Sequence, residues 1–274
     1  MSNIAQALTI AGSDSGGGAG IQADLKTFQM RGVFGTSAVT AITAQNTLGV
    51  HAIHPIPVAT IQAQIQAVAE DFDISAVKLG MLGTAEIIEA VAESLRRYRF
   101  QHLVLDPVMI AKGGAALLQQ SAVAALKQHL LPLADILTPN LPEAEALTGI
   151  EILGAKSAEK AARYLQEWGV KTVVIKGGHS QHSQSAVCCD WVFTPSASFT
   201  LESPRYRTPH THGTGCTFSA CITAELAKGQ SPTIAVKLAK QFITAAITHP
   251  LNLGHGHGPT NHWAFSSLPI AGRR

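Results

Sequence analysis

Residues 211–220 contain glycines, threonines and a cysteine, residue types that can bind an anion and act as a base or nucleophile. Two glycines bracket Thr214, Cys216 follows at once, and an apolar pattern at helical spacing then begins. This order predicts a glycine turn that leads into the N-terminus of a helix. The free N–H groups of such a turn converge on one point, where the helix dipole adds a partial positive charge. The sequence therefore predicts an anion-binding site at residues 213–216.

Cys216 lies beside this predicted anion site, and its residue type allows two interpretations. A helix N-terminus can lower the pKa of a thiol from about 8.5 into the range of about 3.5–7.5, so that Cys216 would serve as a base or nucleophile near neutral pH. A cysteine among Ala, Ser and Thr is also a common small core residue. Taken alone, the stretch favours the core interpretation, and the rest of the chain must decide between the two.

The elements that would position this site follow one another as strand, loop and helix. Short apolar runs predict strands at residues 7–11, 35–47, 76–79, 102–105, 134–137 and 172–175. Helical spacing predicts helices at residues 21–30, 61–72 and 233–248, one capped by Thr84 that runs to about residue 98, and one from the anion turn to Lys228. This alternation is typical of a mostly parallel sheet with helices on both faces, in which ligands bind outside the carboxyl ends of the strands.

The periodicity changes after these strands. Residues 186–194 and 198–203 predict two short strands joined by a Pro-Ser turn, which would form a small β-hairpin flap. No linker rich in Pro, Gly or charge divides the chain, and the sequence contains no internal repeat. We therefore predict a single α/β domain over residues 1–274, with a disordered end at Arg273 and Arg274.

A second glycine-rich loop follows the first predicted strand. Four glycines lie among residues 16–20, between Asp14 and a predicted helix that contains Asp24. The loop has neither the P-loop pattern nor the dinucleotide-binding pattern of glycines. A backbone without side chains lets a ligand pack closely, but it is equally typical of a flexible loop. Both interpretations stay open at this point.

Polar side chains follow several of the predicted strands. Asp106 suits Mg²⁺ or phosphate-side electrostatics, Lys176 suits a phosphate, and Gln45 offers one acceptor and two donors to the edge of a heterocycle. Asn140 and Glu143 are three residues apart at a helix start, so both can face one point beyond the sheet edge. Taken alone, Asp106 is equally well explained as a helix or turn cap, Gln45 can be an ordinary turn residue, and a surface lysine is the commoner explanation of Lys176. With the two glycine-rich stretches, however, they converge on one sheet edge, and phosphoryl transfer requires this combination.

Composition narrows the class of partner. The 274 residues carry a formal net charge of +2 and no long Lys/Arg run, which argues against nucleic acid or an anionic membrane as the main partner. The sequence has no signal peptide and no apolar stretch of about 18 residues, so we expect a cytoplasmic protein. Its four cysteines show no CxxC pairing and are expected to be free thiols. The 12 histidines lack zinc-site spacing and are better explained as exposed loop residues.

The chain as a whole resembles the hydroxymethylpyrimidine/phosphomethylpyrimidine kinases of thiamin biosynthesis, a family within the ribokinase-like superfamily. The resemblance covers residues 7 to about 265, and it is specific because many motifs match in order. The matching motifs are residues 11–24, 43–47, 78–81, 106–108, 138–144, 176–179 and 211–216. The resemblance implies a ribokinase-like α/β domain. Residues 188–195 depart from the family, because they lack the Asp-Gly turn expected there.

The resemblance also implies roles for individual residues. Cys216 stands where most of the superfamily has a catalytic aspartate, and the anion hole for the transferred phosphoryl group corresponds to Gly213, Thr214 and Gly215. The residues implied to bind the pyrimidine are Gly12, Ala19, Asp24, Gln45, Met81 and Val108. The residues implied to bind ATP are Asp106, Asn140, Glu143, Lys176 and Thr211, of which Asp106 and Glu143 would hold Mg²⁺. The adenine contacts are less motif-like and stay unassigned.

The activity implied by the resemblance is MgATP-dependent phosphorylation of 4-amino-5-hydroxymethyl-2-methylpyrimidine on its 5-hydroxymethyl group, and then of the monophosphate to the diphosphate. ATP and Mg²⁺ are the implied cofactors, and a homodimer is the implied assembly. One alternative is a pyridoxine/pyridoxal kinase, whose substrate has a similar ring and hydroxymethyl group. A second alternative is a non-catalytic ligand sensor with the same fold. The presence of Asp106, Glu143, Lys176 and Cys216 argues against a sensor.

Overall fold

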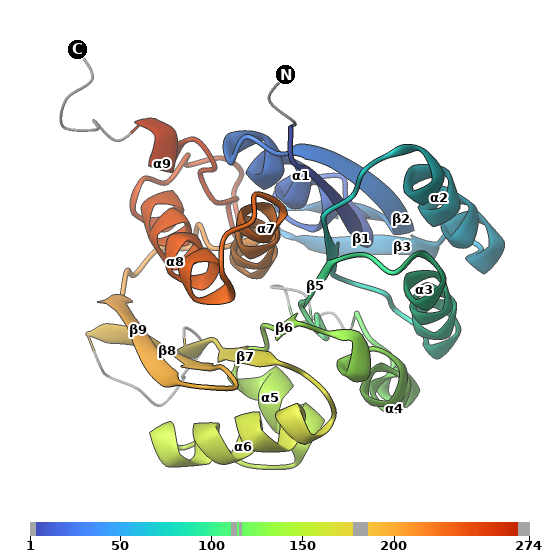
Figure 1. The fold of residues 1–274 in the computed structure, drawn as a ribbon. Coiled ribbons are helices and arrows are strands. Elements are labelled where there is room, and N and C mark those ends of the chain that lie inside the picture. Colours follow the sequence, from blue (N-terminus) through green and yellow to red (C-terminus); the bar gives the residue numbers. More distant parts are fainter. Residues whose placement is uncertain (1–3, 111–113, 115–116, 178–185, 268–274) are drawn as a thin grey trace.

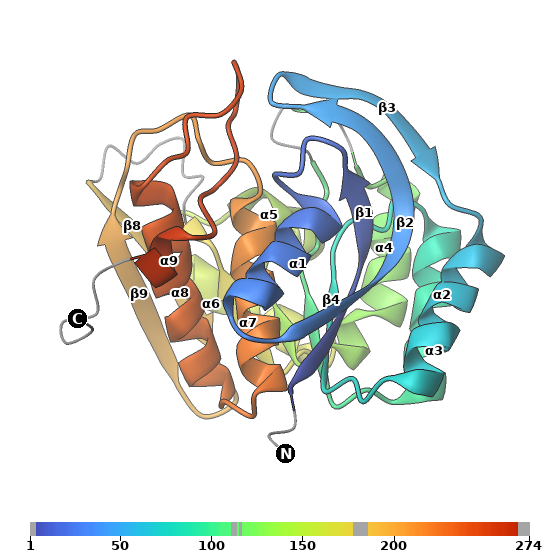
Figure 2. The same cartoon turned by 90° about the horizontal axis from the view of Figure 1, so that it is seen from above.

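A computed structural model describes residues 4–110, 114, 117–177 and 186–267 of the chain. Within these residues the strands form one nine-stranded sheet with helices on both faces (Figure 1 and Figure 2). The disorder expected at Arg273 and Arg274 falls outside the described residues, as do Gly178 and His179 of the motif at 176–179.

The sheet is parallel in its centre and antiparallel at both edges. The strands are β1 Gln6–Asp14, β2 Phe34–Asn46, β3 Gly49–Pro55, β4 Ala76–Leu79, β5 His102–Leu105, β6 Ile136–Leu137, β7 Thr172–Ile175, β8 Val187–Phe193 and β9 Ser198–Pro204. Their spatial order is β3-β2-β1-β4-β5-β6-β7-β8-β9. Neighbours from β2 to β7 pair in parallel, whereas β3, β8 and β9 pair antiparallel. The predicted mostly parallel sheet is confirmed.

The helices cover the two faces of the sheet as separate groups. They are α1 Gly20–Met30, α2 Val58–Asp71, α3 Ala85–Tyr98, α4 Gln120–His129, α5 Leu141–Thr148, α6 Ala155–Glu167, α7 Thr214–Ala227, α8 Pro232–Thr248 and α9 Ala264–Ser267, with a 3₁₀ turn at Leu131–Leu133. Figure 1 shows α2 to α6 on one face and α1, α7 and α8 on the other. Among the described helices, none combines the length and apolar character needed to cross a membrane.

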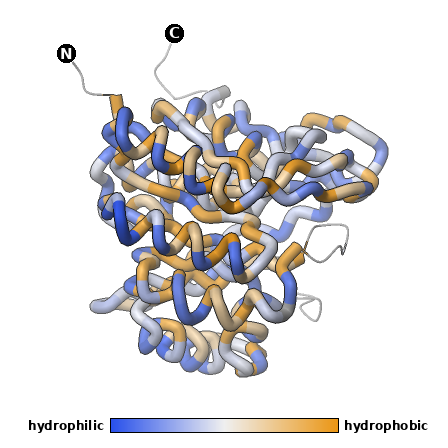
Figure 3. The backbone as a smooth tube through the Cα atoms, turned by 90° about the vertical axis from the view of Figure 1, so that its right-hand side faces the viewer, coloured by the Kyte–Doolittle hydropathy of each residue, from blue (hydrophilic) through white to orange (hydrophobic). Residues whose placement is uncertain are grey.

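The buried run in β1 explains the central place of this strand. Its residues 7–12 are all buried, so both faces of the strand are covered. Leu8 and Ile10 join the core beneath α2 to α6, while Ala7 packs with Phe28 on the opposite face. The helices show hydrophobic and hydrophilic residues in alternation along the tube, as expected for helices with one buried face (Figure 3). This packing fixes the strand ends that hold the site.

The structure contains one strand that the sequence pattern did not reveal. β3 pairs antiparallel with β2 and extends the sheet at that edge, after the turn expected beyond Asn46. Residues 51–55 of β3 are exposed whichever face they point to. Without a buried face, the strand lacks the apolar alternation by which half-buried strands are detected.

The predicted hairpin is present as β8 and β9, which pair antiparallel along their whole length. β8 also pairs antiparallel with β7. The hairpin therefore continues the main sheet as its second edge, and it brings its inner surface beside α8, as Figure 1 shows.

His262 connects the C-terminal segment to the first turn of α7 by a hydrogen bond. Because its side chain is buried, it makes the free energy of unfolding depend on pH. Its Nε2 lies 3.1 Å from the hydroxyl of Thr217, and burial, helped by the charge of Lys26, lowers the pKa of His262 to about 4. An unfolded chain takes up this proton near pH 6.5, so the folded state loses up to about 3 kcal/mol as pH falls from 7 to 4. Urea unfolding of the wild type and of His262→Gln should give stabilities that converge towards pH 4. Parallel pH profiles would contradict the assignment.

Candidate active site

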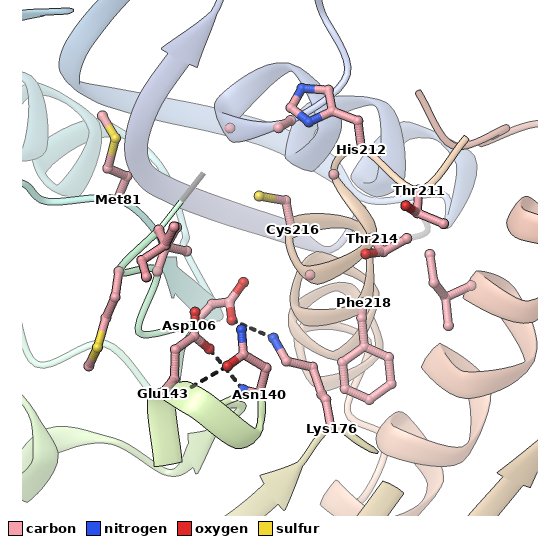
Figure 4. Close-up of a pocket in the computed structure, with 18 of the residues that line it drawn as sticks. Met81, Asp106, Asn140, Glu143, Lys176, Thr211, His212, Thr214, Cys216 and Phe218 are labelled. Atoms are coloured by element: carbon pink, nitrogen blue, oxygen red, sulfur yellow. Dashed lines mark hydrogen bonds and ion pairs between the residues drawn. The ribbon is translucent and has the colours of Figure 1, made fainter. Parts of the chain in front are cut away.

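A cavity of about 640 Å³ opens at the sheet edge where the parallel strands end. Its wall includes every site residue predicted from the sequence except Asp24. These residues are Gly12, Ala19, Gln45, Met81, Asp106, Val108, Asn140, Glu143, Lys176, Thr211, Gly213, Thr214, Gly215 and Cys216. Figure 4 shows Cys216 at the start of α7, with the charged side chains gathered on one side of that start. The predicted convergence of these residues is therefore observed.

The two glycine-rich stretches form one unit, because they pack directly against each other. Gly213 caps α7 with a φ of 78°, a conformation that favours glycine. A Cβ on Gly213 would collide with the carbonyl oxygen of Gly18. The N–H groups of Gly215 and Cys216 belong to the first turn of α7, where the helix itself provides no acceptors. This geometry gives the anion-binding turn that the sequence predicts.

A buried ion pair lies against this turn. Asp106, at the end of β5, accepts a hydrogen bond from the Lys176 ammonium at 2.9 Å, and also from the hydroxyls of Thr138 and Ser219 at 3.2 and 3.3 Å. A Cβ on Gly215 would lie 3.3 Å from Oδ2 of Asp106 and 3.4 Å from Nζ of Lys176. Glycine at this position thus lets the helix start approach both charges.

Asn140 and Glu143 form a capping box at the start of α5. The Asn140 side chain accepts from the Glu143 N–H at 2.9 Å, and the Glu143 carboxylate accepts from the Asn140 N–H at 2.8 Å. Both interpretations of these residues therefore hold, because they cap a helix and also line the cavity beside Lys176 (Figure 4).

A model of the family described as phosphomethylpyrimidine kinase matches residues 14–261. This chain belongs to the phosphomethylpyrimidine kinase family. It is 70% identical to a hydroxymethylpyrimidine/phosphomethylpyrimidine kinase of Haemophilus influenzae, over 98% of this chain and 100% of that protein. It is 50% identical to the thiamine biosynthesis bifunctional protein ThiED of Geobacter sulfurreducens, over 93% of this chain and 51% of that protein. Among solved structures, the ADP complex of Bacillus subtilis pyridoxal kinase matches with a TM-score of 0.89 and 42% identity, covering 97% of this chain and 100% of that one.

The thiol of Cys216 departs from expectation in this family member. The helix N-terminus was expected to lower its pKa, but burial raises the pKa of Cys216 to about 11. The positive charge of Lys78 opposes this effect, while the carboxylates of Asp24 and Asp106 add to it. Burial therefore opposes the expected thiolate at neutral pH in the free protein, because desolvation outweighs the positive charge of Lys78 and the hydrogen bond from the Gly20 N–H.

Asp24 also lies elsewhere than expected. It is fully buried, and both of its carboxylate oxygens accept from the Lys78 ammonium at 2.7 Å, with the Thr9 hydroxyl adding a third bond at 2.6 Å. The cavity lining includes Lys78 but not Asp24. Asp24 thus holds the charge of Lys78 beneath the site and does not bind a ligand directly. A lysine inside the short buried strand β4 was the sequence signal for this ion pair.

The far end of the cavity lies between the hairpin and α8, and the sequence left it unassigned. Lys240 of α8 pairs with Asp190 of β8 at 2.8 Å, and Asp190 also accepts from the Gly177 N–H at 2.9 Å. Arg205 and Tyr206, just after β9, line the same region. Of these residues only Asp190 lies in the segment 188–195, where the chain departs from the family pattern.

Glu143 makes the stability of this kinase depend on pH. Burial, followed by repulsion from Asp106, raises its pKa to about 7 against the attraction of Lys176. Between pH 4.5 and 7 the folded state therefore holds more protons than the unfolded chain, and stability falls as pH rises. Glu143→Gln mimics the protonated form, so we expect it to be more stable than the wild type by about 1–3 kcal/mol at pH 8, with a smaller difference at pH 5. Urea unfolding without ATP or Mg²⁺ tests this; a gain of the same size at both pH values would contradict it.

Proposed function

We propose that the protein catalyses MgATP-dependent phosphorylation of 4-amino-5-hydroxymethyl-2-methylpyrimidine to its monophosphate and then to the diphosphate, in thiamin biosynthesis. One observation supports this most strongly: the anion-binding turn of α7, with Cys216, lies directly against the Asp106–Lys176 ion pair in one cavity. Phosphoryl transfer requires donors for the charge on the transferred group and a cation beside it, both held in place before reaction.

The pyrimidine end of the cavity is proposed to be the region around Gln45 and Met81. The Met81 side chain packs so closely on Gly12 that a Cβ there would collide with its methyl group. Ala19 and Val108 line the same cavity and complete a mostly apolar site for a flat ring. Gln45 then supplies hydrogen bonds to the ring edge.

The phosphate end is proposed to hold Mg²⁺ and ATP. Within the described residues no three His, Cys, Asp or Glu side chains gather as a metal site, and Asp106 with Glu143 provides two carboxylates. Two carboxylates fit Mg²⁺, which takes its other ligands from phosphates and water. Their mutual repulsion, seen in the raised pKa of Glu143, is what a divalent cation would relieve. When bound, the ion would neutralise charge on the phosphates, while Asn140, Lys176 and Thr211 would orient them.

Cys216 is proposed to assist removal of the hydroxyl proton in the first phosphorylation. The acceptor in the second phosphorylation is already an anionic phosphate, so no proton has to be removed there. We further propose that residues 1–274 act as one kinase domain, that the protein is a homodimer, and that it works in the cytoplasm, where ATP is available and thiols stay reduced.

A pyridoxine/pyridoxal kinase is the second candidate, because a pyridoxal kinase is among the most similar solved structures. A coupled assay of ADP release separates the candidates when the pyrimidine alcohol, its monophosphate and pyridoxine are offered separately. We expect both pyrimidines to turn over and pyridoxine to lag by orders of magnitude. Faster turnover of pyridoxine would favour a pyridoxine/pyridoxal kinase. No turnover with any of the three compounds would support a ligand sensor.

A further inference from the structure

Three side chains meet where the glycine loop, the end of β2 and the anion-binding turn come together. Nε2 of His212 lies 2.8 Å from Oδ2 of Asp14 and 3.3 Å from the side-chain nitrogen of Gln45. His212 immediately precedes Gly213, and Gln45 lines the proposed pyrimidine end of the cavity. The positions of the protons in this cluster therefore decide what Gln45 presents to a ligand.

Asp14 fixes the first proton. Its carboxylate accepts backbone N–H groups from Gly16 at 2.8 Å, Gly18 at 3.0 Å and Ala19 at 2.8 Å. A carboxyl group that receives three N–H donors acts as an acceptor only, that is, as the ionised form. Although burial alone would raise it, the pKa of Asp14 is lowered overall by His212 and by the N–H groups of Gly16 and Ala19. His212 must therefore donate to Asp14, and its Nε2 has a hydrogen and no free lone pair.

A protonated Nε2 cannot accept from Gln45. With the amide nitrogen facing His212, two N–H groups would oppose each other at 3.3 Å. A 180° flip of the Gln45 amide places its oxygen towards His212. This oxygen and the Asp14 carboxylate then both accept the Nε2 hydrogen.

Thr43 supports the same orientation from the other side of the amide. Its hydroxyl has one hydrogen, which it donates to the carbonyl oxygen of Ser13 at 2.9 Å. The Thr43 hydroxyl oxygen also lies 3.3 Å from the Gln45 amide atom that faces away from His212. Its hydrogen is already used, so it can offer only a lone pair to that atom. An amide nitrogen at that end would donate to Thr43, whereas an amide oxygen would face a second acceptor.

We propose that Asp14 and His212 are positioning residues that lock the Gln45 amide with its oxygen towards His212 and one N–H pointing into the cavity. In this orientation Gln45 offers a donor to an unprotonated ring nitrogen, and a shared acceptor to an amino group beside it. The inference rests on the proposed function only for the identity of that ring. It adds that a residue of the anion-binding turn region and a residue of the glycine loop set the specificity of the ring site.

The orientation is testable without any reaction. Long-range ¹H–¹⁵N correlation spectra of the labelled wild-type protein, with the His212 signals assigned by comparison with His212→Gln, report which ring nitrogen is protonated. We expect His212 Nε2 to behave as a pyrrole-type, protonated nitrogen. A pyridine-type, unprotonated Nε2 would overturn the proposal, whatever substrate the enzyme uses.

A kinetic experiment tests the consequence for specificity. Gln45→Glu keeps an acceptor for His212 but removes the N–H donor, so KM for the pyrimidine alcohol should rise at least about tenfold while kcat stays within a few-fold. The matched control is Gln22→Glu, the same substitution at the residue whose side-chain oxygen accepts from the Asp14 N–H at 2.8 Å. It does not line the cavity, and its KM should stay within about twofold. An unchanged KM in Gln45→Glu would contradict the proposal. If the wild-type protein itself did not turn over any pyrimidine, the proposed function would be contradicted instead.

Discussion

Replacing Cys216 by alanine is expected to slow the first phosphorylation about 100-fold and the second by less than about tenfold. The first step must remove a proton from an alcohol, and the thiolate of Cys216 is the proposed acceptor. The second step transfers the phosphoryl group to an oxygen that is already anionic. Single-turnover rates measured separately with the alcohol and the monophosphate test this difference, and equal losses in both steps would remove the base role.

The raised pKa of Cys216 adds a second readout. With a pKa of about 11 the thiol is protonated at neutral pH, and the thiolate fraction grows about tenfold for each pH unit. The wild-type rate of the first step should therefore rise through the neutral range and beyond about pH 9, whereas the rate of Cys216→Ala should stay flat. The matched control is Cys221→Ala on the same helix, a fully buried cysteine that does not line the cavity. It should change neither the ratio of the two rates nor their pH profile.

The order of the elements was predictable because each central strand is buried on both faces. β4, β5 and β7 were predicted with the bounds that they have, since runs such as Thr172–Ile175 contain only residues that favour strands. β3 escaped for the opposite reason, because an exposed antiparallel edge strand has no apolar face to repeat in the sequence. The pattern thus reveals the central strands, but it missed helices α4 and α6 as well as β3, although α6 buries Ala158, Ala161, Ala162 and Leu165 in the core.

The site was predictable as a set of residues but not in its electrostatics. Fold class places the residues after β5, β6 and β7 at one sheet edge, which is why Asp106, Asn140 and Lys176 were found together. The pKa of Cys216 depends on how much water reaches the thiol, and no local pattern encodes this. Asp24 was misplaced for a related reason, because it lies on α1 and its partner Lys78 lies on β4, 54 residues away.

Lys176→Met is expected to slow both phosphorylations by a similar factor, about 10²–10³. Lys176 provides a partly buried positive charge 3.4 Å from where a Cβ of Gly215 would lie, next to the anion-binding turn. Both steps move the same γ-phosphoryl group, so a residue that stabilises this group must affect both. The expected pattern is therefore the opposite of that for Cys216→Ala, and single-turnover rates of the two variants distinguish a contact with the transferred group from a contact with the acceptor.

The matched control for this substitution is Lys240→Met, which removes another cavity lysine that pairs with a buried aspartate. It should leave both single-turnover rates within about tenfold at saturating ATP. A further consequence belongs to Lys176 alone, because its charge holds down the pKa of Glu143. Without that charge the pKa of Glu143 rises above about 7, so Lys176→Met should need a higher pH than the wild type to bind Mg²⁺ and ATP. If Lys176→Met slowed only one of the two phosphorylations, or kept the wild-type pH dependence of nucleotide binding, Lys176 would have a structural role and would not contact the transferred phosphate.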